Sequence, residues 1–152
     1  MSMEYNDKYR IKKSKAHESL MQKLSKLKMF EGYQNLMCYS ALIGYINNKY
    51  TEFTAQSEPI QIINWQNTDR NMMDFLAYIK EGRQDILQNQ GDPKYLHFSY
   101  YAYAGFEILI DKLGITEDTI IDENVEMSIA KTMYQLLLTG GFYLEEDLST
   151  GE

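Results

Sequence analysis

The sequence predicts a mainly α-helical fold of about five helices, with a short extended arm or strand at the N-terminus. Apolar residues recur at helical spacing in five separate segments, and glycines stand at or near the ends of most of these segments. A length of 152 residues suits a single domain, 1–152, which can bury a core without the help of disulfides or a metal.

The extended arm is expected just before the first helix. Charged and apolar residues alternate there, so Lys8, Arg10 and Lys12 share one side of the chain and form a basic face. Ser14 then offers a hydroxyl that can cap a first helix over about residues 15–28. This segment therefore predicts a strand followed at once by a helix.

The second helix, expected over residues 33–49, is apolar on nearly every side. No charged residue occurs from Gly32 to Asn48. A helix of this kind either lies at the centre of the core or is shared with a second subunit. Together with a fourth helix over 93–113, it offers more apolar surface than five short helices need. We therefore expect a homodimer or a larger oligomer.

The third helix follows a polar connection and a short extended piece around residues 60–65. Asn67 or Thr68 can cap this helix, and Gly82 ends it. Four apolar residues at helical spacing should turn toward the core. They are Met72, Phe75, Leu76 and Ile79.

The last two helices are bounded by strong start and stop residues. Asp92 is a good N-cap and Pro93 a good first residue for the fourth helix, which Gly114 should follow. A fifth helix is expected from about residue 122 to Gly140–Gly141, with an acidic tail over 140–152 that frays.

The formal net charge of −7 is distributed unevenly along the chain. Residues 1–29 carry eight Lys/Arg and three Asp/Glu, a net of +5, and the rest of the chain is correspondingly acidic. A basic head on an acidic body favours an anionic partner, and a solvated lysine-rich segment is the competing interpretation. The candidate nucleic-acid contacts are Lys8, Arg10, Lys12, Lys13 and Lys15.

No motif predicts catalysis or a bound cofactor. His17 and His97 are far apart in the sequence, and a single cysteine gives no metal-ligand spacing, so no metal site is expected. The best match to a nuclease carboxylate-x-lysine motif is 92–94, but its proline and helix-start position fit an N-cap better. Six aromatics within 95–106 are interpreted as core or interface rather than as a base-stacking surface, because no basic residue interleaves them.

The sequence also predicts a cytoplasmic protein. Cys38 is the single cysteine, no apolar run approaches the length of a membrane span, and the N-terminal residues do not resemble a signal peptide.

Four sequence blocks carry a resemblance to a known family. They are Arg10-Ile-Lys-Lys-Ser-Lys-Ala-His-Glu18, Phe30-Glu-Gly with the run to Ala41-Leu-Ile-Gly-Tyr45, Ser57-Glu-Pro-Ile60 leading to Trp65, and Tyr101-Ala-Tyr-Ala-Gly-Phe-Glu-Ile-Leu109. In this order they resemble the small accessory proteins encoded beside DNA phosphorothioation (Dnd) modification and restriction genes. The resemblance covers 9–114 as a helical core and leaves 115–139 as an additional helix. It implies a role in bacterial defence against foreign DNA and brings no catalytic residues.

Three functions are compatible with these observations. The first is a non-enzymatic accessory or adaptor protein of the defence system that contacts DNA through the basic arm or binds one of the system's larger proteins. The second is a transcriptional regulator, because the order strand, helix, helix over 9–49 is similar to a ribbon-helix-helix unit. The third, and least favoured, is a nuclease with an unrecognised site.

Overall fold

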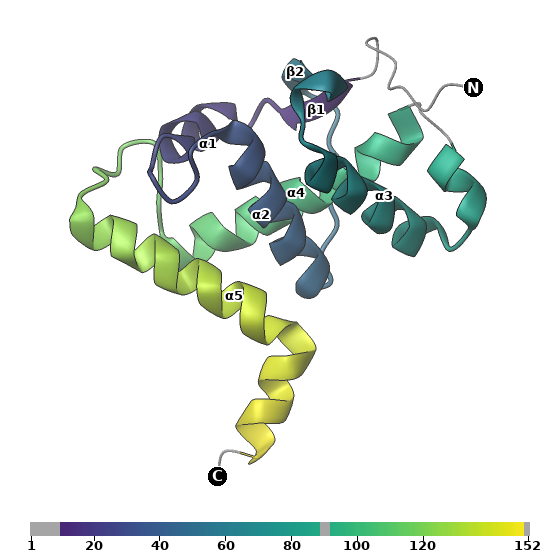
Figure 1. Cartoon of the computed structure of the whole chain (residues 1–152). Helices are drawn as coiled ribbons and strands as arrows, with labels where there is room; N and C mark the ends of the chain where they lie inside the picture. Colours follow the sequence, from purple (N-terminus) through teal and green to yellow (C-terminus); the bar gives the residue numbers. More distant parts are fainter. Residues whose placement is uncertain (1–9, 89–91, 151–152) are drawn as a thin grey trace.

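The computed structural model describes residues 10–88 and 92–150 and shows a mainly helical protein with a small two-stranded sheet near its N-terminal end (Figure 1). This confirms the predicted fold class. In chain order the elements are β1 (Arg10–Ser14), α1 (Glu18–Ser25), α2 (Tyr33–Ile46), β2 (Gln56–Gln61), a 3-10 turn (Ile62–Asn64), α3 (Asn67–Glu81), a second 3-10 segment (Gln84–Gln88), α4 (Asp92–Leu113) and α5 (Glu123–Thr150).

The centre of the fold is the crossing of α2 and α4, at which two glycines let the helix backbones touch. A Cβ at Gly105 would lie 1.7 Å from the Ser40 carbonyl oxygen, and a Cβ at Gly44 would lie 2.2 Å from the Tyr101 carbonyl oxygen. Ordinary contacts begin near 3.4 Å, so neither position has room for a side chain. The uncharged helix of the sequence is therefore a central core element.

Aromatic side chains of α4 fill the core around this crossing. Tyr95, Phe98 and Phe106 are almost completely buried, and the Trp65 ring meets Phe98 edge-on with 5.5 Å between centroids. The prediction that the aromatic run serves the core is confirmed for these residues. No described helix is both long and apolar enough to cross a membrane.

The strand β1 pairs with β2 of the same chain. The pairing is antiparallel, with Arg10 opposite Gln61 and Ile11 opposite Ile60, and an irregularity follows Ile11. In a ribbon-helix-helix unit the first strand pairs with its copy across a dimer. Because β1 finds its partner within the chain, the structure does not support that analogy.

The first helix is shorter than predicted at both ends. Ser14 is still part of β1, and its hydroxyl accepts a hydrogen bond from the Ala16 N–H (3.1 Å) instead of capping a helix. The backbone N–H of Lys15 donates to the Ala55 carbonyl (3.0 Å), which carries the strand pairing one residue further. Helix α1 therefore begins only at Glu18.

The predicted ends of α3 and α4 are confirmed, and two other predicted boundaries are wrong. Gly82 (φ +75°) and Gly114 (φ +66°) end α3 and α4 in the left-handed conformation, as predicted. Helix α2 stops at Ile46 instead of residue 49, because Asn48 takes a left-handed φ of +58°. The extended piece also ends earlier, at Gln61, where a 3-10 turn follows.

Helix α5 does not end at Gly140–Gly141. It continues to Thr150, so the predicted acidic tail is helical up to that residue. Glycine costs a helix about 1 kcal/mol per residue but does not forbid it. Figure 1 shows that α5 changes direction part-way and that its last turns, in yellow, extend away from the rest of the molecule.

Candidate functional site

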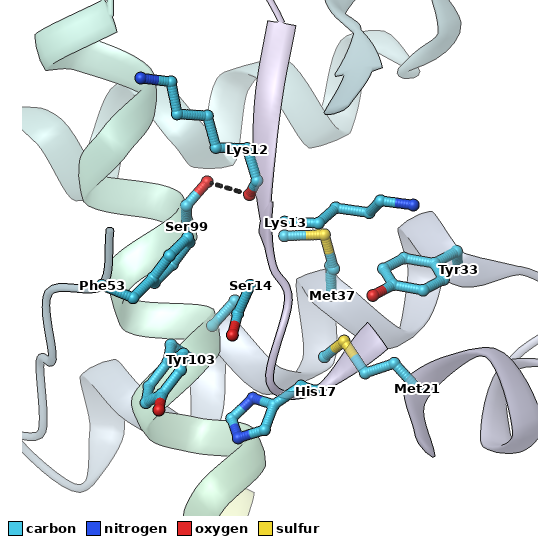
Figure 2. A pocket seen from close by; sticks show the side chains of 11 residues that line it. Lys12, Lys13, Ser14, His17, Met21, Tyr33, Met37, Phe53, Ser99 and Tyr103 are labelled. Atoms are coloured by element: carbon cyan, nitrogen blue, oxygen red, sulfur yellow. Dashed lines mark hydrogen bonds between the residues drawn. The ribbon is translucent and has the colours of Figure 1, made fainter. Parts of the chain in front are cut away.

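The basic arm is built into β1 and does not project from the fold. Ile11 is completely buried, and Arg10 and Lys12 are half-buried beside it. The Ser99 hydroxyl of α4 donates a hydrogen bond to the Lys12 carbonyl (2.7 Å), which fixes the strand against that helix (Figure 2). Arg10 and Lys12 thus occupy alternate strand positions, as predicted, whereas Lys8 lies outside the described residues.

The remaining two members of the predicted basic set diverge. Figure 2 shows the side chains of Lys12 and Lys13 extending to opposite sides of β1. The Lys13 ammonium lies 4.0 Å from the Glu18 carboxylate and 4.5 Å from the centre of the Tyr33 ring. Lys15 is exposed just beyond the strand. The structure therefore separates Lys13 from Lys12, and Lys13 already has an acidic and an aromatic partner.

A small cavity of about 10 Å³ lies beside β1, between the strand, α1, α2 and α4 (Figure 2). His17 is buried at its edge, stacks on Tyr103 with 4.3 Å between ring centroids, and lies 2.7 Å from a Glu107 carboxylate oxygen through Nε2. This space is large enough for about one water molecule. His17 consequently joins α1 to α4, and the cavity is too small for a substrate.

A second histidine lies in a chain of hydrogen bonds that links three segments. His97 of α4 is 2.7 Å from the Tyr50 hydroxyl through Nδ1 and 2.7 Å from a Glu81 carboxylate oxygen through Nε2. The hydrogen bond from His97 is the largest of the effects that lower the pKa of Glu81. The Arg83 guanidinium lies 3.3 Å from the other oxygen of the same carboxylate.

The Tyr50 hydroxyl, the His97 imidazole and the Glu81 carboxylate follow one another in the order of a catalytic triad. In a triad the hydroxyl is the nucleophile. Burial, and to a lesser extent the negative charge of Glu52, raise the pKa of Tyr50 above its ordinary value. That shift opposes formation of the phenolate. The rings of Tyr100 and Tyr101 also meet Tyr50 edge-on at 5.6 and 4.9 Å. The network therefore serves to hold α3, α4 and the segment after α2 together.

Lys94, the lysine of the possible nuclease motif, has a structural partner. It is 4% exposed, and its ammonium lies 2.7 Å from the Asp74 carboxylate of α3 and 3.2 Å from the Leu87 carbonyl. This ion pair fastens the start of α4 to α3. Within residues 10–88 and 92–150, no group of three potential metal ligands comes together.

An open apolar groove lies between α2 and α3. It encloses about 300 Å³. Of the residues that line it, Phe75 is 66% exposed, Ile79 is 51% exposed and Tyr45 is 40% exposed. The groove is lined by Leu42, Tyr45, Thr68, Asn71, Met72, Phe75, Leu76 and Ile79, none of which carries a charge. Depletion of charge and exposed aromatic rings characterise the centre of protein interfaces.

Comparison with protein families places this chain. The model of the family described as DNA sulphur modification system-associated protein 4 matches residues 10–136 of this chain. The chain belongs to this family. No curated protein and no solved structure shows a significant match. The resemblance to accessory proteins of DNA phosphorothioation systems is thereby confirmed. The family match continues beyond residue 114, through the first half of α5.

The α2–α3 groove was not predicted as a site, although the sequence shows the apolar stripe of α3 that lines it. The predicted core stripe of α3 includes Phe75 and Ile79, yet only Leu76 of that stripe is buried. The stripe is wider than the surface that α4 covers. An amphipathic helix with such an excess can be recognised from the sequence, but which part stays exposed depends on the packing.

Proposed function

We propose that this protein is a non-enzymatic accessory or adaptor protein of a DNA phosphorothioation-linked defence system in the bacterial cytoplasm, where it contacts DNA or a DNA-handling partner. Membership of the family supports the link to the system. The observation that carries the non-enzymatic role is the engagement of the polar groups most suited to chemistry. His17, His97 and Lys94 each bind a carboxylate from another segment.

The proposed DNA contact is the exposed part of the basic arm. Lys15 is exposed, Lys12 extends from the side of β1 opposite to Lys13, and Arg10 holds the alternate strand position from Lys12. Much of the remaining charge is acidic and should be repelled by phosphate. Because the Lys13 side chain extends to the other side of β1, we place the contact on Arg10, Lys12 and Lys15.

Salt dependence of binding to duplex DNA tests this contact. The logarithm of the binding constant falls with the logarithm of the salt concentration at a slope of about −0.9 per neutralised phosphate. The double variant Lys12→Ala/Lys15→Ala should therefore lower the steepness of this slope by about 1.8. The matched control is Lys26→Ala/Lys28→Ala, which removes two exposed lysines of the basic head outside the strand. We expect the control to keep the wild-type slope.

The alternative results are equally informative. A slope that changes only in the control places the contact at the α1–α2 connection and refutes the assignment to the arm. Absence of binding for the wild type at low salt removes DNA contact and leaves the adaptor role through a protein partner. Cleavage of plain or phosphorothioated DNA by the purified protein, abolished by a single carboxylate substitution, would refute the non-enzymatic role.

A further inference from the structure

Over residues 123–138, the part of α5 whose side chains the structure describes, apolar side chains lie on two sides of the helix, and one side is covered by the rest of the chain. Ile129, Met133 and Leu136 are buried against the rest of the molecule. On the other side Met127 is 57% exposed and Tyr134 is 65% exposed. Leu138, which lies a further helical turn along, is 55% exposed. Spacings of seven and four residues place the exposed three on one face, which we call the α5 stripe.

The α5 stripe and the α2–α3 groove are complementary in form. A stripe with anchors at i, i+7 and i+11 is what a helix presents to an apolar groove. The groove is concave and uncharged, and the stripe is convex and interrupted only by the exposed Lys131. Figure 1 shows that the first part of α5, which carries the stripe, runs along one side of the molecule, and the exposed stripe is open there to a neighbouring copy.

The exposed apolar area matches what a stable dimer needs. The groove residues Phe75, Ile79 and Tyr45 and the three residues of the α5 stripe are between 40% and 66% exposed. At roughly 200 Å² for each large side chain, these fractions correspond to about 650 Å² of apolar surface on one chain. A standard interface buries about 800 Å² per partner, including its polar rim. Groove and stripe together approach this size, and either one alone falls well short.

We infer that two copies of this chain form a two-fold dimer in which the α5 stripe of each copy lies in the α2–α3 groove of the other. Reciprocal exchange uses both apolar features at once and closes the assembly, as two-fold symmetry requires. Each feature alone is of the size that marks a functional patch on a monomer, and the exchange covers both. This inference concerns assembly and does not depend on the proposed DNA contact.

Two single variants and their mixture test the reciprocal arrangement. Phe75→Glu places a charge in the groove, and Tyr134→Lys places one in the stripe. In the wild type, light scattering and sedimentation velocity should give twice the monomer mass of 17.8 kDa at micromolar concentration. Because truncating or charging a central aromatic anchor typically costs tenfold or more in affinity and each occurs twice in the dimer, each variant alone should dissociate at least about 100-fold more readily.

The equimolar mixture of the two variants distinguishes the exchange from other dimers. A mixed dimer has one groove–stripe contact that is fully native, and the other brings the new Glu and Lys together. Its association should therefore be at least tenfold tighter than that of either variant alone. Ile120→Glu is the matched control, because Ile120 is 80% exposed and lies outside both features. It should dimerise like the wild type. Far-UV circular dichroism confirms that each variant is folded.

Each other outcome overturns the proposal. A wild-type monomer up to 100 µM means that the two features do not bind each other. Loss of dimer in Phe75→Glu alone indicates groove against groove, and loss in Tyr134→Lys alone indicates α5 against α5. If both variants dissociate and the mixture does not recover, the two side chains do not meet across the interface. Species that keep growing with concentration indicate an open chain of copies instead of a closed pair.

Discussion

Replacing Gly105 by alanine should destabilise the protein, although the same change usually stabilises a helix. In a helix interior alanine is favoured over glycine by about 1 kcal/mol. Here the new Cβ would stand 1.7 Å from the Ser40 carbonyl oxygen and 2.7 Å from the Gly44 backbone nitrogen. Both neighbours are backbone atoms, so no side chain can rotate away, and α2 and α4 must separate along their contact. Overpacking of this kind costs about 3 kcal/mol, which leaves a net loss of about 2 kcal/mol.

Urea unfolding followed by circular dichroism at 222 nm measures this loss. With a slope of about 2 kcal/mol per molar urea, the midpoint of Gly105→Ala should fall by about 1 M. Gly114→Ala is the matched control: its Cβ would meet nothing within 4 Å, and its φ of +66° costs about 1 kcal/mol. Gly105→Ala as stable as the wild type, or more stable, would refute the reasoning that α2 and α4 cross in backbone contact.

Three further predictions follow from the polar and sulfur groups. Asp74→Asn should lower the free energy of unfolding by about 3 kcal/mol, because it leaves the buried Lys94 ammonium unpaired. Thermal unfolding should show a smaller loss for Lys94→Met, and equal losses in the two variants would contradict this reasoning. Glu81→Gln should lower stability near pH 7 but not at a pH below the folded pKa of Glu81. This lowered pKa stabilises the fold above the ordinary glutamate range, and the contribution is lost as the pH falls through the folded pKa. Cys38 should react with iodoacetamide far more slowly in the folded than in the unfolded protein, because burial and then Asp69 raise the pKa of its thiol; equal rates would contradict this.

The sequence predicted those features that local chemistry determines. Gly82 and Gly114 end helices because only glycine adopts the left-handed conformation without strain, so both ends could be identified from the residue type alone. The periodicity of the apolar residues likewise predicted α3 and the buried face of α5, on which Ile129 and Met133 are buried. The alternation in β1 placed Ile11 in the core for the same reason.

Features that depend on distant segments were missed or misplaced. Ser14 was expected to cap a helix, but the pairing with β2 keeps it extended, and β2 begins more than forty residues later in the chain. Lys13 and Lys12 were both predicted as nucleic-acid contacts. In the structure an irregularity of the strand separates the two residues, and Lys13 contacts Glu18. The role of Gly105 is invisible in its own helix, because only the approach of α2 requires the absence of a side chain there. In each case the deciding partner lies on another element.

The surface that an oligomer would use also depends on packing between segments that are distant in the sequence. The sequence assigned an excess of apolar surface to the helices over 33–49 and 93–113, and the oligomer expected from it stays a prediction. Those two helices cover each other at the glycine crossing, while Tyr45 of α2 stays 40% exposed along the groove. The other exposed apolar side chains of the groove and the stripe lie on α3 and α5, whose apolar stripes are wider than the surfaces that pack against them. Hydrophobic stabilisation is proportional to the apolar area removed from water, so an interface is favoured where exposed apolar area remains. The packing of the whole chain determines where that area remains.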